Sequence, residues 1–121
     1  MNCIETLLEI QKKYPNRVFL IDSVDGESFT FARMHKEASA VAGYLRSHGF
    51  QKGDRIGLLL CNSSEFAVVY LGCLYAGVIT VPVNPILNRQ DINFILQNSQ
   101  CKQIIVSAET IECLDQEAIL S

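Results

Sequence analysis

The sequence lacks the features that mark several classes of protein. Its ten Lys and Arg residues are scattered rather than gathered in runs, and its formal net charge is −3, so nothing points to nucleic-acid binding. The five cysteines are odd in number, widely spaced and without a C-x-x-C pair, unlike a disulfide framework or a zinc site. The N-terminus lacks a basic segment followed by an apolar core and a cleavage site, which predicts no signal peptide and a cytoplasmic location.

A transmembrane helix is also not expected, although one long stretch, between Glu65 and Arg89, contains no charged residue. About 20 apolar residues suffice to span a bilayer. The second half of the stretch, however, contains Pro82 and Pro85 and indicates a strand followed by a turn. The unbroken apolar part, residues 66–75, is too short to span, so we expect a buried helix that leads into a buried strand.

The chain does contain enough apolar residues for a core. With 121 residues, 49% of them hydrophobic, it is long enough for one domain or one part of a larger one. No internal repeat, low-complexity tract or Pro/Gly/Ser linker divides it. We expect residues 1–121 to form a single unit, with a helix, a hairpin and a second helix in 1–50 and a βαβαβ unit with a terminal helix in 51–121.

Residues 1–50 carry clear start and stop signals. Asn2 with Glu5 resembles a capping box for a short amphipathic helix. The segments "RVFLID" and "ESFTF" flank Asp25-Gly26, a pair typical of turns, and predict a β-hairpin. Thr30 caps a helix that Gly49 ends with a left-handed residue. Four residues of this helix repeat at helical spacing and are expected to be buried: Met34, Ala38, Val41 and Leu45.

Residues 51–121 alternate between strands and helices. Strands are expected at 55–61, 78–83 and 102–107. The first helix between them is capped by Asn62 with Glu65 and ended by Gly77, and the second is capped by Asn88 with Asp91. A last helical segment, 108–121, would bury Ile111, Leu114 and Ala118. Two βαβ units predict an α/β fold of three layers, with a largely parallel sheet core, right-handed crossovers, flanking helices and the N-terminal β-hairpin.

Few residues on this scaffold are suited to chemistry. After the first parallel strand the chain reads "NSSEFA", without the glycines of a dinucleotide-binding turn, and no P-loop pattern occurs. His35 and His48 are 13 positions apart on one predicted helix, which favours surface or boundary positions over a metal site. Cys61 and Cys73 fall on elements that we expect to be buried, where a thiol behaves as a small apolar group and is unreactive.

Two further groups of residues have both a structural and a functional interpretation. Ser63, Ser64 and Asn84 follow the carboxyl ends of parallel strands, where open α/β sheets bind ligands. Helix capping and turn formation are the alternative for the same three residues. The aromatic residues of the first βαβ helix are spaced as a core stripe, which is favoured over a cofactor-binding role: Phe66, Tyr70 and Tyr75.

Several short landmarks occur in a fixed order between Phe19 and Ser107. They are Thr30-Phe31 at a helix start, Gly49, Lys52-Gly53-Asp54-Arg55 before a buried strand, Asn62, Glu65, Gly72, Ala76-Gly77, Val81-Pro82 and Asn84-Pro85. Together they resemble the N-terminal region of the adenylate-forming (AMP-binding) enzymes, most of all the acyl-CoA synthetases, or acid-CoA ligases. One position departs from the family: an acidic residue usually follows the T-[FY] pair, where this chain has Arg33. A cation near a helix N-terminus predicts a small loss of local stability.

The resemblance implies a parent enzyme that activates a carboxylic acid with ATP and Mg²⁺ to an acyl-adenylate and passes the acyl group to coenzyme A. A fatty acid is the leading hypothesis for the substrate. In the family the phosphate loop, the adenine-binding and ribose-binding residues and the catalytic lysine follow this region. The resemblance therefore implies the front part of such a ligase, inactive alone, whose partners are the remaining domains of the parent.

No catalytic, cofactor-binding or metal-binding residue is assigned within the chain. Besides the ligase interpretation, a free-standing α/β interaction module without catalysis stays open, because an unfinished sheet offers edges that pair readily. A homodimer of the 121-residue chain would close such an edge.

Overall fold

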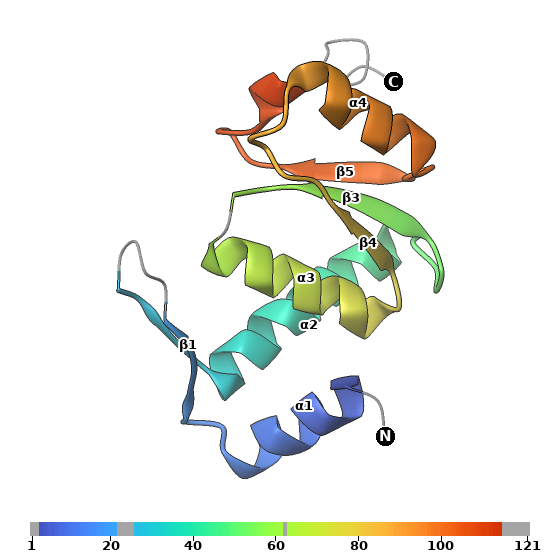
Figure 1. Ribbon diagram of the computed structural model, residues 1–121. Coiled ribbons are helices and arrows are strands. Elements are labelled where there is room, and N and C mark those ends of the chain that lie inside the picture. The colour runs from blue at the N-terminus through green and yellow to red at the C-terminus, as the bar shows by residue number, and fades with distance from the viewer. Residues whose placement is uncertain (1–2, 22–25, 62, 115–121) are drawn as a thin grey trace.

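The computed structural model describes residues 3–21, 26–61 and 63–114 (Figure 1). Strands β3, β4 and β5 form a parallel sheet in the order β4-β3-β5, and β1 pairs antiparallel with β2. The predicted α/β class, hairpin and parallel sheet are thus confirmed. The elements follow in the order α1 (Cys3–Lys13), β1 (Val18–Ile21), β2 (Ser28–Thr30), α2 (Phe31–Ser47), β3 (Arg55–Leu59), α3 (Ser64–Ala76), β4 (Ile79–Pro82), α4 (Arg89–Asn98), β5 (Gln103–Val106) and the 3₁₀ turn η1 (Ile111–Cys113).

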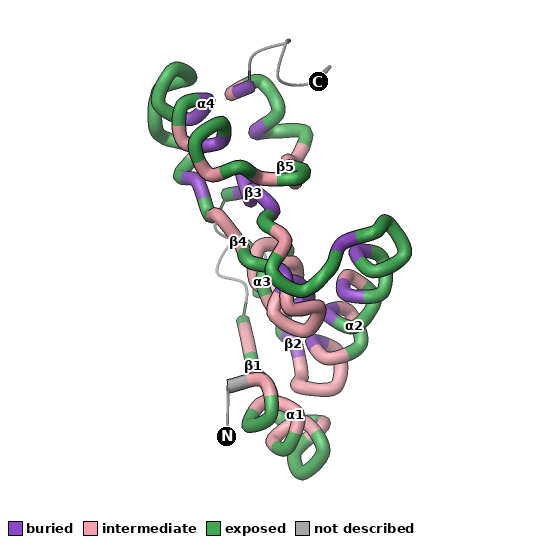
Figure 2. Tube along the Cα trace, turned by 90° about the vertical axis from the view of Figure 1, so that its right-hand side faces the viewer, coloured by how far each residue is buried: buried purple, intermediate pink, exposed green. Residues whose placement is uncertain are grey.

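Helices cover both faces of the parallel sheet. Figure 1 shows α2 and α3 on one face, α4 on the opposite face, and α1 beyond α2 at the far end from α4. This arrangement follows from the two crossovers, because β3-α3-β4 and β4-α4-β5 run in opposite directions across the sheet and both are expected to be right-handed. None of the described side chains of α1 is fully buried (Figure 2), and no described residue of this helix belongs to the two buried cores.

The residues of β3 alternate between two cores, as the period of a strand requires. Ile56 and Leu58 point toward α2 and α3, in a cluster with Leu45, Phe50, Cys73 and Val78. Leu59 points toward α4, where it joins Val83, Ile92, Leu96 and Leu114. Leu58 and Leu59 are both 0% exposed. Each such leucine contributes roughly 1.5–3 kcal/mol of burial free energy, so β3 is the strand on which both cores depend.

Local side-chain contacts start and end the helices where the sequence predicts. The Thr30 hydroxyl accepts a hydrogen bond from the Arg33 backbone N–H at 3.1 Å, and the Asn88 side chain accepts one from the Asp91 N–H at 2.8 Å. Gly49 and Gly77 follow α2 and α3 with φ of +85° and +75°, which L-residues with a side chain rarely adopt.

Some predicted helix caps and the predicted last helix differ from the structure or fall on residues that it does not describe. The cap of α3 is Ser63, whose hydroxyl accepts from the Phe66 N–H at 3.2 Å, and Asn62 lies outside the described residues, as does Asn2. Of the predicted last helix the structure describes only residues 108–114, which contain the short 3₁₀ turn η1, and Thr110 donates its hydroxyl to the Leu59 carbonyl at the end of β3. Leu114 is buried as expected and Ala118 lies outside the described residues, but Ile111, which was also predicted to be buried, is 39% exposed.

Three further burial predictions are wrong. The strand expected to be buried at 78–83 is β4, which lies at the edge of the described sheet, so that Ile79 is 49% exposed. Cys61 is exposed, because β3 ends at Leu59 and the chain leaves the covered part of the sheet. Val41 is only half-buried, and the neighbouring Ala42 takes its place in the buried face of α2.

Helix α3 is apolar on nearly all sides. One side packs in the core with β3 and α2, and Leu71, Leu74 and Tyr75 line an apolar cavity that α1 and β1 also line. The aromatic residues of α3 are not one core stripe: Phe66 and Tyr75 are half-buried, and Tyr70 is 37% exposed. Within the described ranges, none of the helices combines the length and the apolar character that crossing a membrane requires.

Candidate functional site

The carboxyl ends of the parallel strands form a hollow edge of the sheet. The chain leaves β3 toward α3 on one face of the sheet and leaves the neighbouring β4 toward α4 on the other face (Figure 1). Such a switch point is where open α/β sheets bind their ligands. A cavity of about 460 Å³ lies at this place, which we call the β3–β4 pocket; it is lined by Leu60, Cys61, Phe66, Pro82, Val83, Asn84, Pro85 and Ile86.

A second cavity, of about 450 Å³, lies on the other side of Leu60, toward β5. We call it the α2–α3 pocket. Its floor is apolar, and its rim carries three carboxylates, a guanidinium and two hydroxyl groups. The lining residues are Glu27, Phe29, Arg33, Glu37, Leu60, Ser64, Glu65, Val68, Val69, Ile105, Val106 and Ser107.

The polar residues predicted to form a ligand crevice are separated by the structure. Asn84 lines the β3–β4 pocket, where its side-chain oxygen accepts from the Ile86 N–H at 3.0 Å. Ser64 lines the α2–α3 pocket. Ser63 caps α3 and donates its hydroxyl to the Cys61 carbonyl at 3.1 Å. Capping and turn formation thus account for Ser63 and Asn84, and the three residues do not converge on one point.

The two histidines and the buried cysteine occupy structural positions. His35 Nδ1 lies 3.2 Å from the Tyr75 hydroxyl, and His48 stacks on Tyr44 with the ring centroids 4.0 Å apart. Burial raises the pKa of the Cys73 thiol to about 11, which keeps it protonated and a poor nucleophile near neutral pH. Within the described parts of the chain, no three His, Cys, Asp or Glu side chains lie together as a metal site would require.

The Lys52-Gly53-Asp54-Arg55 landmark holds the loop before β3. The Asp54 carboxylate accepts from the Gln51 N–H at 2.8 Å and pairs with the Lys102 ammonium at 3.4 Å. The hydrogen bond from Gln51, followed by the contacts with Lys102, lowers the pKa of Asp54. Lys102 also donates to the carbonyl of Gly49 at 2.8 Å, so this landmark joins the end of α2 to the start of β5 and has a structural role.

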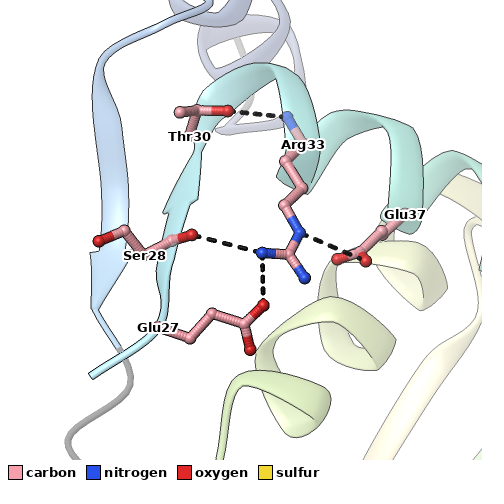
Figure 3. Close-up of polar contacts among 5 residues, drawn as sticks. All are labelled: Glu27, Ser28, Thr30, Arg33 and Glu37. Carbon is pink, nitrogen blue, oxygen red and sulfur yellow. Dashed lines mark hydrogen bonds and ion pairs between the residues drawn. The ribbon is translucent and has the colours of Figure 1, made fainter. Parts of the chain in front are cut away.

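Arg33 forms a side-chain cluster that the sequence did not reveal (Figure 3). Its Nη1 lies 2.6 Å from Glu27 Oε1, its Nε lies 3.6 Å from Glu37 Oε1, and its guanidinium stands 4.0 Å above the centre of the Phe29 ring. The hydrogen bond with Glu27 is the largest contribution that raises the pKa of Arg33. These contacts offset the loss expected for a cation at the start of α2. The spacing of Arg33 and Glu37, four residues apart, was the one sequence signal for the cluster.

Thr110 is a second residue that the sequence did not single out. It is 2% exposed, donates its hydroxyl to the Leu59 carbonyl at 2.6 Å and accepts from the Ser107 N–H at 3.0 Å. It thereby fixes the carboxyl end of β3 and the chain that follows β5, next to the wall of the α2–α3 pocket.

Comparison with known proteins places the chain in a family. Residues 7–120 match the family described as AMP-binding enzyme. Among curated proteins, the chain is 36% identical over 104 residues to crotonobetaine/carnitine-CoA ligase of Citrobacter koseri, a match that covers 84% of this chain and 20% of the ligase. It is also 36% identical over 86 residues to the long-chain-fatty-acid-CoA ligase FadD13 of Mycobacterium tuberculosis, with 71% of this chain and 17% of that protein covered.

Similar solved structures are also enzymes of this kind or domains of them. The N-terminal domain of FACL13 from Mycobacterium tuberculosis superposes with a TM-score of 0.85 at 29% identity, covering 93% of this chain and 28% of that one. A benzoate CoA ligase from Burkholderia xenovorans superposes with a TM-score of 0.87 at 27% identity, covering 100% of this chain and 24% of that one. The chain spans about a fifth of the length of the curated relatives it matches. It belongs to the AMP-binding enzyme family and corresponds to the N-terminal region of the adenylate-forming fold, as in the acyl-CoA synthetases.

Proposed function

We propose that this chain is the N-terminal part of an ATP-dependent acid-CoA ligase. The parent enzyme converts a carboxylic acid and ATP to an acyl-adenylate and pyrophosphate, and then transfers the acyl group to the thiol of coenzyme A with release of AMP. The observation that supports this best is the family match over residues 7–120, together with relatives whose names include ligases of crotonobetaine or carnitine, of fatty acids and of 4-coumarate with coenzyme A.

Within this enzyme we assign the described residues a structural role. The sheet β4-β3-β5 and its two cores supply a rigid wall, and the two pockets lie on the edge of the sheet where ligands or neighbouring parts of an α/β enzyme meet it. The carboxylates around the α2–α3 pocket would repel a nucleotide phosphate, and the described lining of the β3–β4 pocket has no cationic side chain. The described residues therefore do not fit ATP with Mg²⁺, and we propose that the chain alone is inactive.

For the substrate we propose a fatty acid and for the compartment the cytoplasm. The names of three relatives refer to long-chain or medium-chain fatty-acid ligases, and support the substrate class. The remaining domains of the ligase are the proposed partners of the chain, whose residues 1–121 we treat as one unit.

A free-standing interaction module is the second candidate, and one observation favours it. In the described part of the sheet, β4 and β5 each pair with β3 alone, which leaves an unpaired edge on either side. Apolar residues stand exposed on or after β4, with Ile79 49% and Ile86 89% exposed. Such edges pair readily with further strands, and a two-fold homodimer would use both copies equally.

Three experiments test these candidates. The coding sequence that follows Ser121 is expected to encode the rest of a ligase, and the product is expected to form acyl-CoA from fatty acids faster than from benzoate or 4-coumarate. Thioester formation from an aromatic acid alone would refute the fatty-acid assignment, and a stop codon directly after Ser121 would favour the interaction module. Sedimentation of the purified chain tests the homodimer: a monomer at all concentrations to tens of micromolar refutes it.

A further inference from the structure

The α2–α3 pocket combines an apolar floor with an excess of negative charge. Its floor consists of side chains from β2, α3 and the ends of β3 and β5, among them Phe29, Val68 and Val69. Its volume of about 450 Å³ falls within the range of ligand sites, roughly 300–1,000 Å³. A pocket of this kind accepts an apolar group that carries a charge at one end, and the rim decides the sign of that charge.

Arg33 is the one cation among the described residues that line the pocket, and it is already engaged. Figure 3 shows its guanidinium held between Glu27 and Glu37, with Nη1 also donating to the Ser28 carbonyl at 3.4 Å. The ring of Phe29 covers one face of the guanidinium. A further anion would have to displace a carboxylate from Arg33 to bind here. The rim is therefore unsuited to phosphate or to the carboxylate of a fatty acid.

The carboxylates outnumber this cation by three to one. Glu27 and Glu37 flank Arg33, and Glu65, on the first turn of α3, adds a third negative charge to the lining. The exposed fractions of the Glu37 and Arg33 side chains are 38% and 40%, so a ligand can reach both. Lysine and arginine match such a site, because each buries an aliphatic stem on apolar surface and keeps its charged end beside carboxylates.

We propose that the α2–α3 pocket binds a protein segment that inserts a Lys or Arg side chain next to an apolar side chain. The aliphatic parts of the segment pack on Val68 and Val69, and its cationic group lies beside the carboxylates of Glu37 and Glu65, which line the same pocket. This interaction surface is independent of the catalysis proposed above, because it depends only on the shape and charge of the described residues. The site recognises a basic, apolar segment and rejects an acidic one.

Two matched peptides test the proposal by nitrogen-15 NMR titration of the 121-residue chain. The probes are acetyl-Leu-Lys-Leu-amide and acetyl-Leu-Glu-Leu-amide, which share apolar content and differ in the sign of one charge. The lysine peptide is expected to shift the amide signals of residues 64–69 and 105–107 and to bind at least tenfold more tightly than the glutamate peptide. Equal binding of both peptides, or shifts confined to other parts of the chain, would overturn the proposal.

Charge-removal variants supply the second arm. The double variant Glu37→Gln with Glu65→Gln is expected to weaken binding of the lysine peptide by about threefold to tenfold, since exposed ion pairs are individually weak. Glu9→Gln, an exposed position on α1, is the matched control and is expected to bind as the unaltered chain does. Unchanged affinity in the double variant, or a change in its self-association instead, would contradict the assignment. Hexanoate and hexylammonium serve as small probes of opposite charge, and tighter binding of hexanoate at these amides would also contradict it.

Discussion

Replacing Gly72 by alanine tests how closely α2 and α3 pack. A Cβ atom at this position would lie 2.5 Å from both Cβ and Cγ1 of Val41 and 3.0 Å from the Ala38 carbonyl oxygen. Carbon atoms in favourable contact are about 3.5–4.0 Å apart, so the helices must separate by about 1 Å. The Val41 Cβ and the Ala38 oxygen cannot rotate away, because both are fixed to the backbone of α2.

The expected change in stability is the difference between two effects. Overpacking of a core costs about 1–3 kcal/mol, and the rigid contacts of Gly72 place this variant at about 3 kcal/mol. Alanine in a helix gains about 1 kcal/mol over glycine. The net loss is then about 2 kcal/mol, which for a chain of this length lowers the melting temperature by about 8 °C.

Gly43→Ala is the matched control, because Gly43 also lies within a helix, α2, but a Cβ atom added there would meet no other atom within 4 Å. Only the propensity effect applies at this position, so we expect a gain of about 0.5–1 kcal/mol. Thermal melts and urea titrations followed by circular dichroism measure both variants. Should Gly72→Ala prove as stable as the unaltered chain or more so, the close packing of α2 on α3 would be wrong.

Three further predictions concern the core, the Arg33 cluster and the cysteines. Leu59→Asp is expected to unfold the chain, because an unpaired charge in a fully buried position costs several kcal/mol against a total stability of about 5–15 kcal/mol. The control Gln90→Asp, on the exposed start of α4, is expected to change stability by about 0.5 kcal/mol or less. Equal melting temperatures of the two variants would contradict the placement of β3. Arg33→Glu restores a capping box with Thr30 yet is expected to lower the melting temperature, because the new carboxylate faces Glu27 and Glu37; a higher melting temperature would show that the cluster contributes nothing. Alkylation at pH 8 followed by mass spectrometry is expected to label exposed Cys61 first and Cys73 last, because burial raises the Cys73 pKa to about 11, and early labelling of Cys73 would refute its burial.

The raised pKa of the Cys73 thiol also predicts how the stability of the folded chain changes in alkali. The folded pKa of Cys73, about 11, lies above the ordinary value of 9.0, so the folded state retains its proton where the unfolded state has lost it. Stability is therefore expected to fall as the pH rises from about 9 to 11.

Local features of the fold were predictable from the sequence, and contacts between distant segments were not. Thr30 and Asn88 cap helices through hydrogen bonds to residues three positions away, and Gly77 needs only its own positive φ. The hydrogen bond from Thr110 to the Leu59 carbonyl joins residues 51 positions apart, and no local sequence pattern predicts it.

Apolar sequence that continues past the covered surface misled the burial predictions for Cys61 and Tyr70. The apolar run that begins at Ile56 continues through Leu60 to Cys61, but coverage by helices ends before the run does, so Cys61 is exposed. Helix α3 is apolar on nearly all sides, and periodicity therefore did not reveal that Tyr70 faces outward. Arg89, the first residue of α4, donates to the Glu112 carbonyl at 2.6 Å, which is why the neighbouring Gln90 is the better silent control.

The most direct test of the proposed function is acid-dependent exchange of pyrophosphate into ATP. The purified 121-residue chain is expected to show no exchange above background with any of a panel of fatty and aromatic acids, whereas the longer ligase that contains it is expected to show exchange that depends on the added acid. Exchange catalysed by the 121-residue chain alone would contradict the account.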